Sequence, residues 1–215
     1  MQTEELVQQL VAQGPKKRWL HPGKAALGLL AFMLVYYGLI VGFSNFRTDL
    51  AVKFKEPLYL LEVGCAFLSG LTALFAANWL ALPDVGQRPH IRFLPFLPLG
   101  ALLGLQLYMM SPLSWDALYE CLKLELYMPT VRIMLYGLFP AAIVFFVMEK
   151  AAPIRCCWAG SMAALAVACF GYILLRLTDG MDDPMRVAMW YFMPVGLMAV
   201  VGMMAGGMTL KRVWR

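Results

Sequence analysis

Charged residues are scarce in this sequence. Asp, Glu, Lys and Arg together make up 14% of the 215 residues, whereas hydrophobic residues make up 61%. A soluble globular domain uses roughly 25% charged residues, because its surface must carry polar groups. The low charge and a mean hydropathy of +0.69 therefore exclude an ordinary soluble domain and indicate a protein that lies in a lipid bilayer.

Acidic residues are missing from the middle of the long apolar runs. A proton or ion relay through a membrane normally places acids near the middle of the bilayer, so this absence argues against a pump or a secondary transporter. Glu62 and Arg132 both lie near the ends of apolar runs. We predict that these two side chains lie close enough to form a buried ion pair.

The five cysteines lack the spacing of a metal site, since no C-x2-C pair occurs. The adjacent Cys156 and Cys157 would point about 100° apart on a helix, which makes them a poor pair of ligands. Cys65 and Cys169 stand inside apolar runs, where a thiol behaves as a small apolar side chain. We therefore predict no metal site and no cofactor.

Six apolar runs are long enough to cross a membrane, which takes about 20 helical residues. They cover residues 25–43, 57–82, 93–110, 128–148, 154–175 and 187–210. We expect an all-α integral membrane protein, with a six-helix transmembrane bundle over residues 24–215. Residues 1–23 are polar and lack the apolar core of a signal peptide, so we expect them to be a cytoplasmic segment.

Positive charge is unevenly divided between the two sides of this topology. With six spans, both ends of the chain and the second and fourth loops share one side, which holds most of the lysines and arginines and few of the acids. The positive-inside rule then places both termini in the cytoplasm. This topology accounts for the net charge of +5 without nucleic acid. Cys121 becomes the only cysteine in an outer loop, and so the one most open to oxidants.

The amino-terminal "TEELVQQLVAQ" has the pattern of a short amphipathic helix. Thr3 can cap the helix and the acids Glu4 and Glu5 suit its amino terminus, while the following leucines and valines form an apolar stripe. A helix of about ten residues is marginal alone in water, so the stripe needs a partner. The membrane surface and a groove on a protein are both open, and we favour the protein.

Small residues recur at the spacing that lets membrane helices approach closely. The repeats are Gly160, Ala164 and Ala168, then Gly202 and Gly206, and finally Gly100 and Gly104. They predict a compact bundle without a wide aqueous lumen. A second repeat, of methionines at 181, 185, 189 and 193, could in principle bind Cu(I), although packing is the simpler interpretation.

Three blocks of the sequence resemble one known family. They are "MQTEELVQQL", "GFSNFRTDLAVKFKEPLYLLEVG", and "EKAAPIRCCWAGSMAALAVACFGYILL" followed by "DDPMRVAMWY" and a closing "LKRVWR". In this order they are similar to the NrsF proteins, the negative regulators of sigma F. The chain lacks the cysteine that such proteins tend to carry just after the fifth span, and Glu62 stands where a lysine is expected.

The resemblance implies a membrane anti-sigma factor without catalytic activity. Its cytoplasmic segment would hold an extracytoplasmic-function (ECF) sigma factor and release it on metal or oxidative stress. The residues implied in sigma binding are Thr3, Glu4, Glu5, Leu6, Val7 and Leu10, and the candidate sensor thiols are Cys121, Cys156 and Cys157. The alternative is a soft-metal (Hg or Cu) membrane transporter or sensor that uses Cys156, Cys157 and the methionines. The sequence leaves the oligomeric state open.

Overall fold

The computed structural model describes six stretches of the chain. They are residues 21–44, 46–81, 89–111, 128–150, 155–180 and 182–210. The structural statements that follow concern these residues.

Regular structure in the described stretches is helical throughout, which confirms the all-α prediction. The long helices are α2 (Pro22–Phe43), α4 (Pro57–Leu80), α5 (Phe96–Met110), α7 (Met128–Lys150), α8 (Cys156–Thr178) and α10 (Met193–Thr209). The short elements are α3 (Leu50–Lys53), the 3-10 turn η2 (Pro89–Phe93), α9 (Pro184–Arg186) and the π-helical turn η4 (Val187–Phe192).

Six helical segments are long and apolar enough to cross a membrane. Four of them are the long helices α2, α4, α7 and α8. The other two are compound: residues His90–Met110 combine η2 with α5, and residues Pro184–Thr209 combine α9, η4 and α10. This architecture is compatible with a multi-pass membrane protein.

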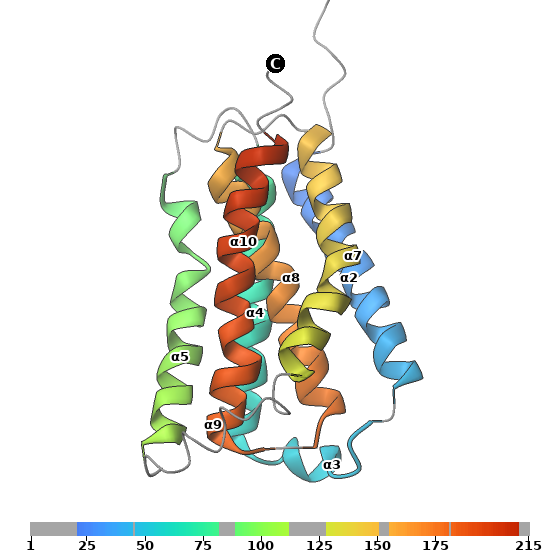
Figure 1. Cartoon of the computed structure of the whole chain (residues 1–215), viewed down its shortest axis with the longest axis vertical. Helices are drawn as coiled ribbons and strands as arrows, with labels where there is room; N and C mark the ends of the chain where they lie inside the picture. The colour runs from blue at the N-terminus through green and yellow to red at the C-terminus, as the bar shows by residue number, and fades with distance from the viewer. Residues whose placement is uncertain are drawn as a thin grey trace, which may run out of the picture.

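The chain runs up and down through the bundle. Helix α2 begins and α10 ends at the same end of the molecule, which we call the terminal end (Figure 1). The short helices α3 and α9 lie at the opposite end, which we call the distal end (Figure 1). The described part of the chain therefore begins and ends at the same end of the bundle.

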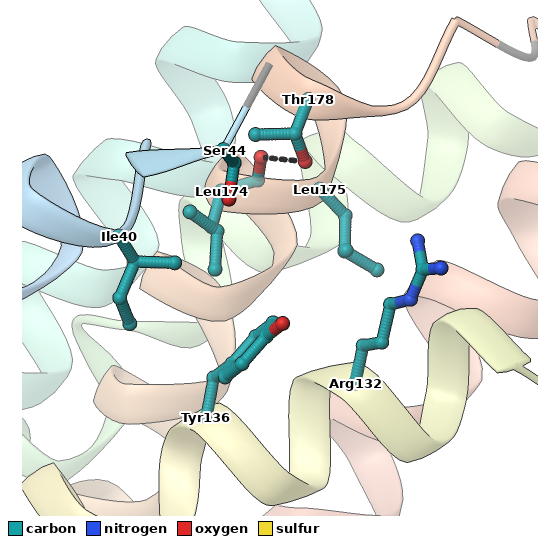
Figure 2. A pocket seen from close by; sticks show the side chains of 7 residues that line it. All are labelled: Ile40, Ser44, Arg132, Tyr136, Leu174, Leu175 and Thr178. Carbon is teal, nitrogen blue, oxygen red and sulfur yellow. Dashed lines mark hydrogen bonds between the residues drawn. The ribbon is translucent and has the colours of Figure 1, made fainter. Parts of the chain in front are cut away.

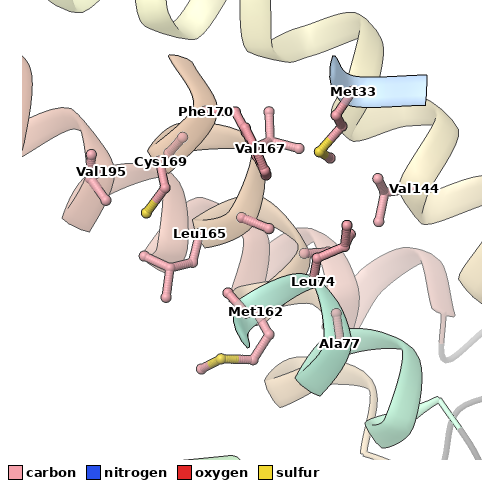
Figure 3. Close-up of a cluster of buried hydrophobic side chains, with 14 of the residues drawn as sticks. Met33, Leu74, Ala77, Val144, Met162, Leu165, Val167, Cys169, Phe170 and Val195 are labelled. Atoms are coloured by element: carbon pink, nitrogen blue, oxygen red, sulfur yellow. The ribbon is translucent and has the colours of Figure 1, made fainter. Parts of the chain in front are cut away.

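Helix α8 is the centre of the bundle. In its most apolar stretch 83% of the residues are buried, against 44% in α4 and 28% or less in the other spans. Alanine, glycine and cysteine dominate "CCWAGSMAALAVACFGY", and these small side chains let four neighbouring helices pack around one backbone. Larger side chains fill the spaces between the helices, among them Met33, Leu74, Val167 and Phe170 (Figure 3).

The closest helix contact joins α8 to α10. A Cβ atom added to Gly160 would lie 2.3 Å from the backbone oxygen of Gly202, and one added to Gly206 would lie 2.4 Å from the backbone oxygen of Cys156. At Gly202 the added atom would lie 2.3 Å from the Cβ of Ala164. Only glycine fits these positions, which confirms two of the three predicted small-residue repeats. The third is wrong, because an added Cβ at Gly100 or Gly104 meets nothing within 4 Å.

The outer surface of the helices is apolar. Large side chains such as Leu34, Val35 and Leu39 on α2 and Leu107 on α5 are about half exposed or more. A monomeric soluble protein rarely exposes apolar surface of this extent. These side chains are suited to contact lipid.

Candidate functional site

A buried ion pair between α4 and α8 lies at the centre of the candidate site. Glu62 is 1% exposed and Arg176 is 4% exposed. The Nε atom of Arg176 lies 2.8 Å from Oε1 of Glu62, and its Nη2 donates a hydrogen bond of 3.0 Å to Oε2. Helix periodicity places Tyr172 one turn before Arg176 on the same face of α8, and its hydroxyl donates to Oε1 of Glu62. Gln106 of α5 donates in turn to the hydroxyl oxygen of Tyr172, at 2.9 Å.

The partner predicted for Glu62 was Arg132, and the structure corrects this. Glu62 pairs with Arg176, whereas Arg132 is exposed and belongs to α7. Both predicted side chains do lie toward the distal ends of their helices. Sequence spacing gives the depth of a residue along a span but not the neighbour of each span, and α8 packs against both α4 and α7.

A second buried arginine extends the network toward the distal end. The side chain of Arg47 is 1% exposed and lies between Asp49 and Asp182. It donates to both oxygens of Asp49 at 2.7 Å and to those of Asp182 at 3.0 and 2.6 Å. Its Nη1 also reaches the backbone oxygen of Asp179 at 3.3 Å. One side chain thus connects the segment after α2 with the segment after α8.

Asp182 is the point where three cations meet. It accepts from Arg47, from Nη1 of Arg176 at 3.1 Å, and lies 3.2 Å from Nζ of Lys53. Tyr59 supports the same region, because its hydroxyl donates to the backbone oxygen of Arg176 at 2.9 Å and its ring centroid lies 5.1 Å from the Arg176 guanidinium. We call the connected set the distal charge network. Its members are Arg47, Asp49, Lys53, Tyr59, Glu62, Gln106, Tyr172, Arg176 and Asp182.

The charged groups of the distal charge network outside the spans have shifted pKa values. Burial opposes ionisation of Asp182, but hydrogen bonds from Arg47 and Lys53 outweigh it and hold its pKa well below the ordinary value. The hydrogen bond to Asp49 is the main cause that raises the pKa of Arg47, and the bond to Glu56 raises that of Lys53. Because Asp182 has a depressed pKa, its contribution to stability is present above about pH 4 and is lost as the pH falls further.

The distal charge network can hold the segments at the distal end together, and it is less suited to bind a ligand. Its carboxylates already face guanidinium or ammonium groups, and removing one partner of a fully buried pair such as Glu62 and Arg176 typically costs about 3–5 kcal/mol. The network therefore resists separation of α3 and Asp182 from the end of α8. Among the described residues, no group of three or more His, Cys, Asp or Glu side chains could hold a metal ion.

The described cysteines lie on α4 and α8, and none of them is a member of the distal charge network. Cys156 is buried and Cys157 is exposed at the start of α8, at the terminal end. Their side chains diverge as predicted for neighbours on a helix. Cys169 is fully buried in the core, and Cys65 is partly buried.

Several predicted site residues fall outside the described stretches. They are Thr3, Glu4, Glu5, Leu6, Val7, Leu10 and Cys121. Their roles in sigma binding and in sensing stay predictions.

The described members of the methionine repeat differ in their exposure. Met185 is 6% exposed whereas Met193 is 57% exposed, and Met181 lies outside the described stretches. The π-helical turn η4 lies between these residues and shifts the helical register. Cys156 and Cys157 also diverge, so the described members of this ligand set do not converge, and the soft-metal alternative stays a prediction.

Sequence reasoning missed Arg47, Arg176 and Asp182, the charges that organise the distal charge network. A signal was available for one of them, because Arg176 directly follows the fifth apolar run at the end of the bundle where the second run, which holds Glu62, begins. No spacing rule connects Arg47 to Asp182 across 135 residues.

These features define a class of protein: a six-helix bundle with the helices of a membrane protein, packed around a central span and fastened by buried charges at one end. The family model described as "Negative regulator of sigma F" matches residues 10–212, nearly the whole chain. The chain therefore belongs to this family, which confirms the family resemblance stated from the sequence. No match is found among curated proteins or among solved structures.

The family name implies a negative regulator of a sigma factor, that is, an anti-sigma factor. It also suggests a regulatory role rather than an enzymatic one. The matched range contains all six apolar segments and the whole distal charge network. Of the residues predicted to bind sigma, only Leu10 falls within it.

Proposed function

We propose that this protein is an anti-sigma factor of the bacterial inner membrane that holds an ECF-type sigma factor through its cytoplasmic amino-terminal segment. Metal or oxidative stress releases the sigma factor. The observation that carries the proposal is the family match over residues 10–212. It assigns nearly the whole chain, including the bundle, to sigma-factor regulation.

The arrangement of the bundle supports the role of the amino-terminal segment. Because α2 begins and α10 ends at the terminal end, the segment before Pro22 joins the bundle on the side that carries the positively charged flanks. The positive-inside rule makes this the cytoplasmic side, where sigma factors act. An amphipathic helix that is marginal alone gains its stability from the groove that binds it.

The distal charge network supports a path for the signal. It fastens the outer segments to the end of α8, and α8 is bound tightly to α10 by the glycines near the terminal end. A stimulus that opens the network would free α8 and α10 to move as one packed unit. Coupling between two distant sites requires an element that can adopt two arrangements, and we propose α8 and α10 as that element.

Paired substitutions in the amino-terminal helix test the proposal. We expect Leu6→Ala with Leu10→Ala to weaken binding of the cognate ECF sigma factor by about tenfold or more, since each buried leucine contributes roughly 1.5–3 kcal/mol. The measurement is the Kd between the purified full-length chain in nanodiscs and a panel of the host's ECF sigma factors.

The matched control is Gln8→Ala with Gln9→Ala, which changes the polar side of the same helix. This control should leave the Kd within about twofold. Equal losses for the two pairs would show that the stripe does not make the contact. Unchanged binding after removal of residues 1–13 would reject the amino-terminal segment as the binding site.

A further inference from the structure

An open pocket of about 380 Å³ lies near the distal ends of three helices. Helix α2 contributes Ile40 and the adjoining Ser44, α7 contributes Arg132 and Tyr136, and α8 contributes Leu174, Leu175 and Thr178 (Figure 2). Helices α2 and α7 diverge toward the distal end (Figure 1). The pocket is distinct from the distal charge network, none of whose members lines it.

The pocket has a defined inner limit. Deeper in the bundle α2 and α7 are in contact again, because the Tyr36 hydroxyl donates to the backbone oxygen of Tyr136 at 3.1 Å. The rings of Tyr36 and Phe139 also meet there, with their centroids 5.5 Å apart. The space between α2 and α7 is therefore closed on the side of the bundle centre.

The lining of the pocket is amphipathic. Ile40, Leu174 and Leu175 make apolar walls, while Arg132 supplies a guanidinium group and Tyr136 a hydroxyl group. Within the described stretches, neither of these two polar groups has a hydrogen-bond or ion-pair partner, and no carboxylate lines the pocket. The Thr178 hydroxyl is already used, since it donates to the backbone oxygen of Leu174 at 3.0 Å (Figure 2).

We propose that this pocket binds an anionic phospholipid. The phosphate would accept from Arg132 and the Tyr136 hydroxyl, and the start of an acyl chain would lie against Ile40 and Leu174. If the six apolar segments span the bilayer, the ends of α2, α7 and α8 lie at the depth of the head groups in the leaflet away from the termini. The surrounding bilayer therefore supplies phospholipid directly at the pocket.

A phospholipid fits the lining better than a free anion does. Arg132 is exposed, and an exposed cation alone holds a small anion weakly. Apolar walls add nothing to the binding of inorganic phosphate, but they stabilise an amphiphile that buries hydrocarbon against them. Charge-assisted hydrogen bonds from an arginine to phosphate supply the specificity for the anionic head group.

The test compares the thermal stability of the full-length chain in two kinds of nanodisc. One contains phosphatidylcholine alone and the other contains phosphatidylcholine mixed with phosphatidylglycerol. We expect phosphatidylglycerol to raise the Tm of the wild-type chain. In the Arg132→Gln variant, most of this rise in Tm should be absent. Loss of one charge-assisted contact corresponds to about tenfold weaker lipid binding.

Lys55→Gln is the matched control, because Lys55 is an exposed cation near the distal end that does not line this pocket. It should keep the rise in Tm, which separates a specific site from general attraction to an anionic surface. If Arg132→Gln does not fold, Tyr136→Phe takes its place with a smaller expected loss.

Three results would overturn the proposal. The first is an absence of any rise for the wild-type chain. The second is an equal rise for the wild-type chain and the pocket variant. The third is an equal rise when inorganic phosphate is added to phosphatidylcholine discs, which would identify a small-anion site.

Discussion

Single residues decide how firmly the distal end is held. Arg176 reaches Glu62 on one side and Asp182 on the other, so one side chain joins a transmembrane helix to the segment that follows α8. Charges this deeply buried are stable only while both partners are present. The stability of the distal end therefore depends on the completeness of the network more than on any one hydrogen bond.

Replacing Arg176 tests this dependence. We expect Arg176→Met to lower the free energy of unfolding by about 3–5 kcal/mol, because Glu62 is left buried and uncompensated. Chemical unfolding in detergent, followed by circular dichroism, measures the change. Lys55→Met removes an exposed cation near the same end and should change the free energy by less than about 0.5 kcal/mol.

The double variant Glu62→Gln with Arg176→Met sharpens the test. It removes both charges, so it should be more stable than Arg176→Met alone. If the free energy of unfolding of the double variant falls by the sum of the decreases measured for the two single variants, the two side chains do not act as a pair.

At the scale of elements, the fold depends on the packing of α10 against α8. Their backbones touch at Gly160, Gly202 and Gly206, where no side chain fits. In lipid there is no hydrophobic driving force between two apolar helices. Close backbone contact, with its van der Waals packing, therefore supplies much of the attraction between them. Figure 1 shows the two helices side by side along the bundle, and the close glycine contacts lie toward the terminal end.

Glycine substitutions separate this contact from a general effect of added bulk. We expect Gly202→Leu to destabilise the bundle by about 3 kcal/mol or more, because its side chain must displace the backbone of α8. Gly104→Leu adds the same side chain where an added Cβ meets nothing within 4 Å, and should cost less than about 0.5 kcal/mol. Equal Tm values for the two variants in detergent would contradict the packing account.

The sequence predicts the elements better than it predicts their neighbours. The six apolar runs correspond to six helical segments, because helix length and hydropathy are local properties of the chain. The repeat at Gly160 was correctly interpreted as a packing face, whereas the same pattern at Gly100 faces away from the bundle. A local pattern marks a face that can pack, but only the tertiary arrangement decides which faces are used.

The same limit explains the outcome at the candidate site. Glu62 was recognised as a buried charge because an acid inside an apolar run needs a partner. Choosing between Arg132 and Arg176 required knowing that α8 lies between α4 and α7. Arg47 and Asp182 were missed because both lie in short polar connections, where the sequence has no periodicity to interpret.

At the scale of the whole molecule, the two ends of the bundle have different tasks in the proposed function. The terminal end carries the segment that binds sigma, and the distal end carries the buried charges that fasten the outer segments. This division requires the two ends to lie on opposite sides of the membrane. Cys157, exposed at the start of α8, and Lys55, after α3, report on the two sides.

Thiol labelling tests this orientation. In a chain that retains Cys157 as its only cysteine, we expect a membrane-impermeant maleimide to label inside-out vesicles and not intact spheroplasts. A chain whose only cysteine is introduced by Lys55→Cys should show the reverse. Labelling of Cys157 from the outer side would place the terminal end in the periplasm and contradict the topology.

The most direct test of the central claim is transcription from a promoter of the cognate ECF sigma factor, measured in cells that lack this protein. Restoring the full-length chain should repress the promoter, and a chain that lacks residues 1–13 should reach the membrane in equal amount without repressing it. Equal repression by both chains would contradict an anti-sigma factor that acts through its amino-terminal segment.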